Sequence, residues 1–217
     1  MTCWAIIVAG GSGSRFGAPK QFEQLGARSV LARAAQTAAD CCDGVVVVVA
    51  ADMIERARIE VAAAAPGAPV IVGGATRAQS VRNGLGSVPA EATIILVHDA
   101  ARPLAPRSLY MSVIGAVREG ASAVVPGVAV IDTIRSRAGG VIDRDQLVAV
   151  QTPQGFSADV LRAAHADAPD ATDDAGLVEA AGGSVLVVAG ASVNLKITTP
   201  IDPVSYTHLT LPTKRIV

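Results

Sequence analysis

The sequence of 217 residues has few aromatic residues and little net charge. Aromatic residues make up only 3% of the chain, whereas 51% of residues are hydrophobic and 21 are glycine, which is ample for one core without disulfides. A formal net charge of −1 provides no overall positive field to attract nucleic acid or an anionic membrane. We therefore expect one compact domain that binds neither nucleic acid nor membrane.

Cysteine and long apolar runs are also scarce. Cys3, Cys41 and Cys42 form neither a CxxC pair nor a convincing disulfide framework. No stretch reaches the roughly 18 uninterrupted apolar residues of a membrane-spanning helix. The first ten residues are a short apolar run that breaks into glycines, without a basic leader. These features predict a cytoplasmic protein with buried, inert thiols.

What the chain does contain is a series of short apolar runs, most of which lack the alternation of a sheet with one wet face. Segments with helical periodicity separate them, as in crossover connections between parallel strands. The pattern predicts the α/β class with a doubly wound, mostly parallel sheet. The expected strands are Trp4–Ala9, Val45–Ala50, Val70–Val72, Ile94–Val97, Ala123–Val125 and Ser184–Val188, and the expected helices are Val30–Ala39, Met53–Ala65, Arg77–Leu85, Pro106–Glu119 and Ala158–Ala166.

Two segments depart from this alternation. Residues 131–150 contain a Gly139–Gly140 turn between two charged segments, which indicates a projecting β-hairpin arm. Residues 203–217 are rich in Thr and β-branched residues and include Pro212, which argues against a helix. We interpret residues 1–202 as a single domain and residues 203–217 as a non-native tail.

The segment from Ala9 to Gly17 follows the first expected strand and is rich in glycine. Ligands of such a sheet bind at the carboxyl ends of the strands, where glycines let backbone amides approach a polyphosphate. Arg15 and Lys20 add the positive charges that suit the transition state of nucleotidyl transfer. The segment fits neither the dinucleotide-binding motif G-x-G-x-x-G nor the P-loop motif G-x-x-x-x-G-K-[ST]. An ordinary turn without a ligand remains an alternative interpretation. The segment resembles the G-G-x-G-x-R-x-G…P-K motif of sugar-nucleotide pyrophosphorylases and related nucleotidyltransferases.

Five further segments narrow this resemblance: Gly73–Val81, Val97–Pro103, Asp132–Thr133, Gln151–Gln154 and Asn194–Thr198. With these motifs in this order, the chain resembles the 2-C-methyl-D-erythritol 4-phosphate cytidylyltransferase family of the nonmevalonate isoprenoid pathway. The resemblance runs from about Ala5 to Asp202. The resemblance implies a Rossmann-like nucleotidyltransferase fold and direct, in-line transfer of CMP from CTP to this alditol phosphate, with release of pyrophosphate. It also implies Mg²⁺ or another divalent cation as cofactor.

The resemblance further implies roles for individual residues. Arg15 and Lys20 would stabilise the transition state, while Lys196 and Arg144 would hold the phosphate of the alditol substrate. The nucleotide would be contacted by Ala9, Gly10, Gly11, Gly13, Gly74, Ala75 and Ser80, and the alditol phosphate by Asp99, Arg102, Thr133 and Thr152. Asp99 is also the candidate metal ligand. In the family the arm reaches a second subunit, so Arg144 and Thr133 would act in the partner's site of a homodimer.

The residues themselves support some of these roles. Lys196 lies in an otherwise apolar, strand-like run from Val193 to Ile197, where an idle ammonium would be costly to desolvate. Asp99 follows a buried strand, although it could instead cap a helix, and His98 is interpreted as a structural group. The acidic run at residues 172–174 is interpreted as the N-cap of a helix over Ala175–Ala181.

Three other functions remain open from the sequence. A ribitol 5-phosphate cytidylyltransferase would need only a different hydroxyl pattern in the substrate. A guanylyltransferase acting on a molybdenum cofactor shares the glycine-rich opening, although the segments around His98 and Lys196 argue against it. A noncatalytic nucleotide-binding module is the alternative from a different class, but such a module need not retain charges that act only in the transition state.

Overall fold

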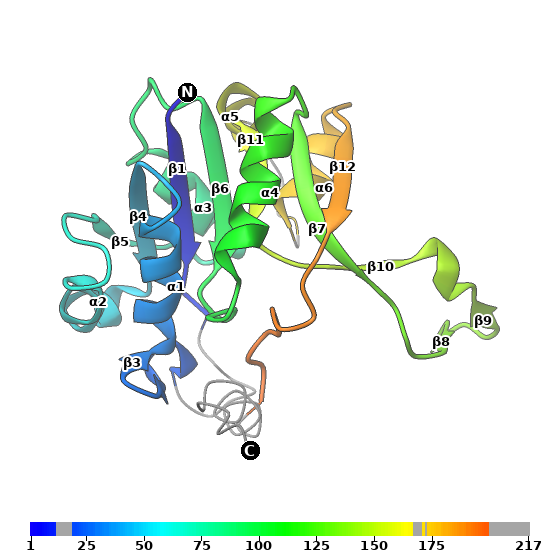
Figure 1. Ribbon diagram of the computed structural model, residues 1–217, viewed down its shortest axis with the longest axis horizontal. Helices are drawn as coiled ribbons and strands as arrows, with labels where there is room; N and C mark the ends of the chain where they lie inside the picture. The colour runs from blue at the N-terminus through cyan, green and yellow to red at the C-terminus, as the bar shows by residue number, and fades with distance from the viewer. Residues whose placement is uncertain (12–18, 167–170, 172, 200–217) are drawn as a thin grey trace, which may run out of the picture.

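The computed structural model describes residues 1–11, 19–166, 171 and 173–199. An eight-stranded sheet with helices on both faces forms the body of the protein (Figure 1). Six strands run in one direction: β1 (Cys3–Val8), β4 (Gly44–Val49), β5 (Val70–Val72), β6 (Ile94–Asp99), β7 (Ala123–Ala129) and β12 (Val185–Ala189). β10 (Val148–Val150) and β11 (Gln154–Ser157) run in the opposite direction. The predicted α/β class and the mostly parallel sheet are confirmed.

The order of the strands fixes where a ligand can bind. β1 lies between β4 and β6, and the chain moves outward from β1 to β4 and β5 before it returns to β6 on the other side of β1. This reversal places a crevice at the carboxyl ends of β1 and β6. Beyond β6, β11 pairs with both β6 and β7 and therefore stands between them.

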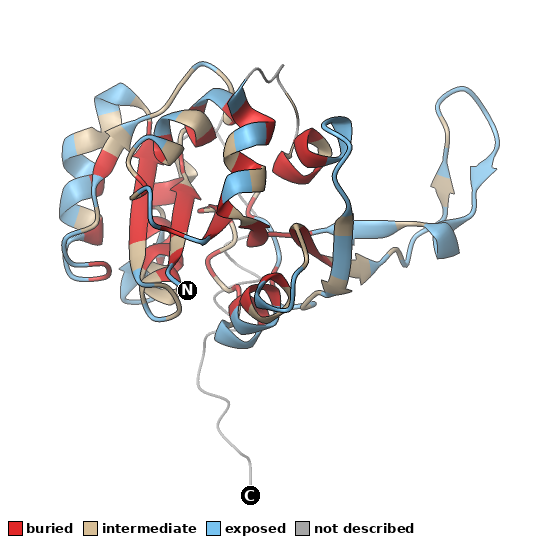
Figure 2. Ribbon diagram, turned by 90° about the horizontal axis from the view of Figure 1, so that it is seen from above, coloured by how far each residue is buried: buried red, intermediate tan, exposed pale blue. Residues whose placement is uncertain are grey.

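Helices cover both faces of the sheet in the described part of the chain. α1 (Val30–Ala39), α2 (Ile54–Val61) and α4 (Arg107–Arg118) pack on one face together with Ile7 of β1. α3 (Arg77–Leu85), α5 (Ala158–Ala166) and α6 (Asp174–Ala180) pack on the other face with Ile6 of the same strand. Consecutive residues of a strand point to opposite faces, which explains why the strands read as continuous apolar runs. Figure 2 shows strands buried between the helices, and β1, β4 and β6 are the most deeply buried of them.

Side-chain caps define where several helices begin. Ser29 accepts a hydrogen bond from Ala32 N at the start of α1, and Thr76 accepts one from Gln79 N at the start of α3. Asp173 caps α6 by accepting from Gly176 N, which confirms the predicted N-cap. Such caps satisfy backbone amides that the first helical turn leaves unpaired. The second helix is shorter than expected, because α2 ends at Val61 and a short 3-10 helix, η2 (Ala51–Met53), precedes it.

The predicted arm is present as a projecting hairpin (Figure 1). β8 (Ile134–Arg135) pairs with β9 (Val141–Ile142), and the turn between them holds Gly139 and Gly140 at φ values of 110° and 81°. These positive φ values are readily accessible only to glycine. A 3-10 helix, η3 (Arg144–Gln146), leads back to β10. The proposed tail at residues 203–217 lies outside the described residues.

A second small hairpin lies near the crevice. η1 (Lys20–Phe22) leads into β2 (Gln24–Leu25), which pairs with β3 (Arg28–Ser29) just before α1. In the part of the chain that the structure describes, no helix is long and apolar enough to cross a membrane.

Candidate active site

A cavity of about 430 Å³ opens at the carboxyl ends of β1 and β6, where the topology predicts a ligand site. It is lined by residues from five separate segments of the chain. Nine of the predicted site residues line it: Ala9, Gly10, Gly11, Lys20, Gly74, Ala75, Ser80, Asp99 and Lys196. Arg15 and Gly13, which were also predicted for this site, lie outside the described residues.

The backbone after β1 enters this cavity directly. Ala9 N donates to Val48 O at 2.8 Å, so the amide of Ala9 completes the sheet. Gly10 and Gly11 follow it along the cavity wall. Ala9 therefore anchors the start of the loop, and an amide contact to a phosphate would have to come from residues after it.

The loop before α3 forms the opposite wall and is held by its own side chains. Ser80 Oγ donates to Thr76 O at 2.9 Å and accepts from Gly74 N at 3.1 Å. Gln79 Oε1 accepts from Ala75 N at 3.0 Å. A Cβ added at Gly74 would lie 2.2 Å from Gln79 Cγ, so a larger residue would displace Gln79 from this bond. Ser80 thus shapes the loop, and the hydroxyl that was expected to face a base is bonded to backbone.

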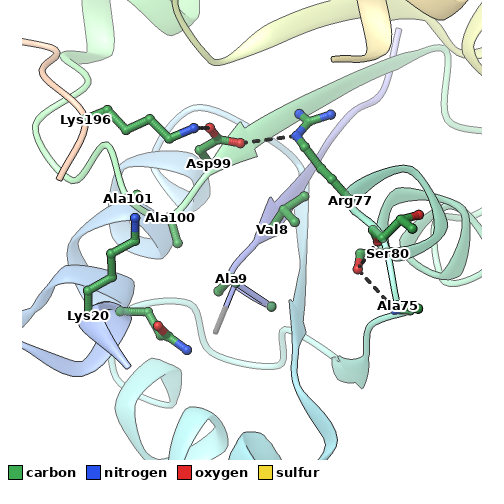
Figure 3. A pocket seen from close by; sticks show the side chains of 15 residues that line it. Val8, Ala9, Lys20, Ala75, Arg77, Ser80, Asp99, Ala100, Ala101 and Lys196 are labelled. Carbon is green, nitrogen blue, oxygen red and sulfur yellow. Dashed lines mark hydrogen bonds and ion pairs between the residues drawn. The ribbon is translucent and has the colours of Figure 1, made fainter. Parts of the chain in front are cut away.

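Charged side chains meet at the rim of the cavity (Figure 3). Lys196 Nζ donates to Asp99 Oδ2 at 2.6 Å, and Arg77 Nε lies 3.5 Å from Asp99 Oδ1. Burial by itself would raise the pKa of Asp99, but the Lys196 and Arg77 cations outweigh it and lower the pKa to about 2. Lys20 points in from another wall and donates from Nζ to Ile197 O at 2.7 Å. Asp99 is therefore an ionised carboxylate at neutral pH.

The prediction of a strand around Lys196 is wrong. Residues 191–199 form turn and coil, and the side chain of Lys196 is 43% exposed. Val193 and Leu195 are each 44% exposed, so this apolar run forms no buried strand. The position of Lys196 comes instead from its ion pair with Asp99 and from the backbone bond of Ile197 N to Ala101 O at 2.8 Å.

His98 has the structural position that the sequence predicted. It is fully buried, with Nε2 3.2 Å from Arg102 O and Nδ1 3.0 Å from Thr152 Oγ1. Because a carbonyl can only accept, Nε2 carries the hydrogen and Nδ1 accepts from the Thr152 hydroxyl. Burial is the largest cause that lowers the pKa of His98, to about 4. Thr152 Oγ1 also accepts from Asp99 N at 3.0 Å, so this buried pair fixes the backbone beneath Asp99.

A smaller cavity of about 150 Å³ adjoins the first one, since Arg77, Asp99 and Lys196 line both. Arg102 and Thr152, both predicted to contact substrate, also line it. Arg102 donates from Nη1 to Asn194 O at 2.7 Å and thereby holds the loop that carries Lys196. The two cavities together bring the described nucleotide and substrate residues predicted in the body to one edge of the sheet.

The two predicted site residues of the arm lie elsewhere. Neither Thr133 nor Arg144 lines either cavity, and Arg144 Nη1 donates to Ile131 O within the arm. This placement agrees with the expectation that the arm does not serve the site of its own chain.

Arg77 is the functional candidate that sequence reasoning missed. It lines both cavities and contacts Asp99 as well as Asp174, whose Oδ2 lies 2.7 Å from Arg77 Nη1. A signal was available, because a cation directly after the N-cap Thr76 opposes the helix dipole and calls for an acidic partner. The acidic partners are distant in sequence and could not be identified from it.

Comparison with known proteins agrees with this arrangement. A family model described as IspD, 2-C-methyl-D-erythritol 4-phosphate cytidylyltransferase, matches residues 3–208. The chain is 46% identical over 209 residues to a protein of that name from Nocardia farcinica (strain IFM 10152), covering 91% of this chain and 89% of the relative. The chain belongs to the 2-C-methyl-D-erythritol 4-phosphate cytidylyltransferase family.

Solved structures support the same assignment. The crystal structure of 2-C-methyl-D-erythritol 4-phosphate cytidylyltransferase from Thermus thermophilus matches with a TM-score of 0.80 and 35% identity, covering 96% of this chain and 98% of that one. A 4-diphosphocytidyl-2C-methyl-D-erythritol synthase from Anaerococcus prevotii DSM 20548 matches with a TM-score of 0.84 and 28% identity, covering 96% and 95%. The predicted family and the prediction of a nucleotidyltransferase enzyme are confirmed.

The acidic residues of this cytidylyltransferase-family site bear on metal binding. Among the described residues, no group of three or more His, Cys, Asp or Glu side chains could hold a metal ion. Asp99 is the acidic residue in the lining of the larger cavity. One carboxylate combined with phosphate oxygens is a usual way of binding Mg²⁺, so the site fits a cation held mainly by the nucleotide.

Proposed function

We propose that this protein transfers CMP from CTP to the phosphate of 2-C-methyl-D-erythritol 4-phosphate and releases pyrophosphate. The observation that carries the proposal is the convergence of Lys20, Arg77, Asp99 and Lys196 on one cavity beside the backbone of Gly10 and Gly11. Lys20 and the glycine amides suit a polyphosphate, Arg77 and Lys196 hold Asp99 beside it, and family membership supplies the identity of both substrates.

The two cavities divide the substrates between them. The triphosphate would lie along Ala9–Gly11, with Gly13 and Arg15 contributing as the family resemblance implies, and cytosine would face the loop of Gly74, Ala75 and Ser80. The alditol phosphate would occupy the smaller cavity beside Arg102 and Thr152. Asp99 and Lys196 line both cavities, so in this proposal they would stand where the two substrates meet.

The chemistry needs no covalent enzyme intermediate. A phosphate oxygen of the alditol attacks the α phosphorus of CTP, a new P–O bond forms, and the bond to the β phosphate breaks with its electron pair leaving on pyrophosphate. Lys20 and Arg15 stabilise the charge that develops on the nonbridging oxygens, while Lys196 orients the attacking phosphate. Catalysis then rests on positioning and fixed charge.

Mg²⁺ is part of the proposal. Asp99, ionised because its pKa is near 2, would contribute a protein oxygen to the cation, and the CTP phosphates would supply the rest. When bound, Mg²⁺ withdraws negative charge from phosphate oxygens.

We also propose a cytoplasmic homodimer in which each arm serves the partner's site. The arm exposes Ile131, Val141 and Ile142 to solvent and carries Thr133 and Arg144 away from the cavities of its own chain. An exposed apolar segment of this kind is typical of an interaction surface. Arg144 and Thr133 would then meet the alditol phosphate in the partner's site.

The direct test is pyrophosphate release by the purified full chain with CTP, MgCl₂ and 2-C-methyl-D-erythritol 4-phosphate. Ribitol 5-phosphate in place of this substrate, and GTP in place of CTP, are the parallel reactions. We expect release only with CTP and the methylerythritol phosphate, and loss of release on chelation of the metal.

Each contrary outcome has a definite meaning. Release that requires ribitol 5-phosphate would reassign the substrate. CTP binding without release in any reaction would indicate a noncatalytic nucleotide-binding module. Activity that survives complete chelation would contradict the role of Mg²⁺.

A further inference from the structure

A row of charged and polar side chains runs from the cavity rim into the body. Lys196 contacts Asp99, Asp99 lies beside Arg77, and Arg77 Nη1 donates to Asp174 Oδ2 at 2.7 Å. The other oxygen of Asp174, Oδ1, lies 3.0 Å from Nε2 of His165. Because a carboxylate accepts, Nε2 of His165 carries the hydrogen. Five residues thus form one continuous chain of contacts, although Arg77 and Asp174, like Asp99 and Lys196, are 97 positions apart in the sequence.

The inner end of this row is buried. Asp174 is 0% exposed and His165 is 3% exposed, whereas Lys196 at the outer end is 43% exposed. A carboxylate at this depth is costly unless it is paired, and removing its partner leaves an uncompensated charge. The buried Asp174 carboxylate therefore anchors the Arg77 side chain, which lines the cavity.

Helix capping does not account for Asp174. Asp173 already caps α6 through its bond from Gly176 N, and both oxygens of Asp174 are bonded to side chains of other elements. Arg77 and His165 come from α3 and α5, so Asp174 joins the three helices on one face of the sheet. One of its oxygens holds Arg77 and the other bonds His165.

Arg77 in turn acts on the group at the junction of the two cavities. Its Nε lies 3.5 Å from Asp99 Oδ1, while Lys196 bonds the other oxygen, Oδ2, at 2.6 Å. The Asp99 carboxylate is held between two cations and its orientation is fixed. An arginine without an anchor would have to lose rotamer entropy before it could hold Asp99 in this way.

We propose that Asp174, supported by His165, is a positioning residue for the transfer reaction: through Arg77 it orients Asp99 at the junction of the two cavities. This inference rests on the proposed function. Asp174 does not touch either cavity and acts only through Arg77. Losing it frees Arg77 and Asp99 without changing the residues that hold the nucleotide along Gly10 and Gly11.

Steady-state kinetics of the Asp174→Asn variant test the proposal. The substitution keeps the shape of the side chain and removes its charge. We expect kcat/KM for 2-C-methyl-D-erythritol 4-phosphate to fall by up to about 100-fold, as for misplaced reacting groups, with the KM for CTP close to that of the wild type. Glu179→Gln is the matched control, an exposed carboxylate of the same helix, and it should leave these constants unchanged.

A double-mutant cycle separates positioning from a general structural effect. If Asp174 acts through Asp99, then Asp174→Asn added to an Asp99→Asn enzyme should change kcat/KM by no more than about twofold. Full additivity of the two losses would overturn the proposal. If Asp174→Asn does not fold, as judged by circular dichroism, His165→Leu replaces it in the same cycle with the same expectation.

The outcomes distinguish this inference from the function on which it rests. A wild-type chain that releases no pyrophosphate would contradict the proposed function and this inference with it. An active wild type whose Asp174→Asn variant keeps full kcat/KM, or loses CTP affinity to the same extent as turnover, would contradict the inference alone.

Discussion

The body and the arm of this protein differ in how far their side chains are buried. In the body, strands such as β1 are covered on both faces, and even charged residues such as Asp174 are buried and paired. In the arm, two-residue strands pair with each other, and Ile131 is 82% exposed. Figure 2 shows the projecting hairpin mostly in the colour of exposed residues. A two-stranded hairpin without a core is marginal by itself in water.

The difference shows which regions of the molecule are stabilised by contacts within a single chain. The cavities belong to the body and are shaped by contacts within it, including the Ser80 and Arg102 bonds to backbone. The arm also has internal bonds, such as the one from Arg144 to Ile131 O, but its apolar side chains Ile131, Val141 and Ile142 are exposed and would gain burial only against another surface. Substitutions in the two regions should therefore differ in kind as well as in size.

The largest effect is expected at Lys20 in the body. Removing one charge that stabilises the transition state costs about 100- to 1,000-fold in kcat, so Lys20→Ala should lower kcat by this amount and CTP affinity much less. Steady-state kinetics and calorimetric titration with CTP measure the two quantities. Arg118→Ala, which removes an exposed cation at the end of α4, is the control. Equal losses of turnover and affinity would instead make Lys20 a ground-state binding residue.

Matched truncations compare the two regions directly. Leu161 is fully buried, and Leu161→Ala should lower the free energy of unfolding by about 2–5 kcal/mol. Ile142→Ala in the arm should change it by no more than about 0.5 kcal/mol in the dilute protein, while sedimentation shows weaker self-association. Urea unfolding provides the first comparison. A large loss of monomer stability at Ile142 would mean that the arm packs on its own chain.

The pH dependence of stability should come from the body. His98 has a folded pKa of about 4, below the ordinary 6.5, so its contribution is complete above pH 6.5 and is lost as the pH falls toward 4. One such group gives a slope of at most about 1.4 kcal/mol per pH unit in this window. His98→Asn should flatten the dependence in urea titrations, and Ile142→Ala should retain it. An unchanged slope in His98→Asn would contradict the buried, neutral state of His98.

A small gain in stability is expected at Tyr110. Its ring packs against His98 with centroids 5.5 Å apart, and its buried hydroxyl has no hydrogen-bond partner among the described residues. Since an unpaired buried hydroxyl costs free energy, Tyr110→Phe should raise the free energy of unfolding by up to about 1 kcal/mol. A decrease of that size would reveal a partner for the hydroxyl.

Local patterns were sufficient for much of the body. The bounds of α1, α3 and α5 match the prediction, because Ser29 and Thr76 cap the first two and the apolar spacing continues to their ends. Strands such as β1 and β4 were found because burial on both faces makes them continuously apolar, whereas β12, predicted from a similar run, exposes Leu186 and Val187. The hairpin was found from Gly139 and Gly140, whose conformation few other residues adopt.

Features that depend on distant partners could not be predicted in this way. β11 contains Gly155 and no apolar run, and it is a strand because β6 and β7 flank it. Arg77 meets Asp174 across 97 positions, and Asp99 meets Lys196 across another 97. The sequence shows that these charges exist, but only the fold determines how they pair.

The place of β11 also constrains how the chain can assemble. β6 and β7 precede β11 in the sequence, yet within the described residues they share no backbone ladder and are joined only through it. A Cβ at Gly155 would lie 2.4 Å from Val113 Cγ1, so α4 must settle closely over the inserted strand. During synthesis from the N-terminus, β1, β4, β5 and β6 can pair first, while β7 must wait for residue 157 to emerge. The sheet is thus completed in its interior, and this late, long-range closure should slow folding relative to a sheet built by adding strands at its edge.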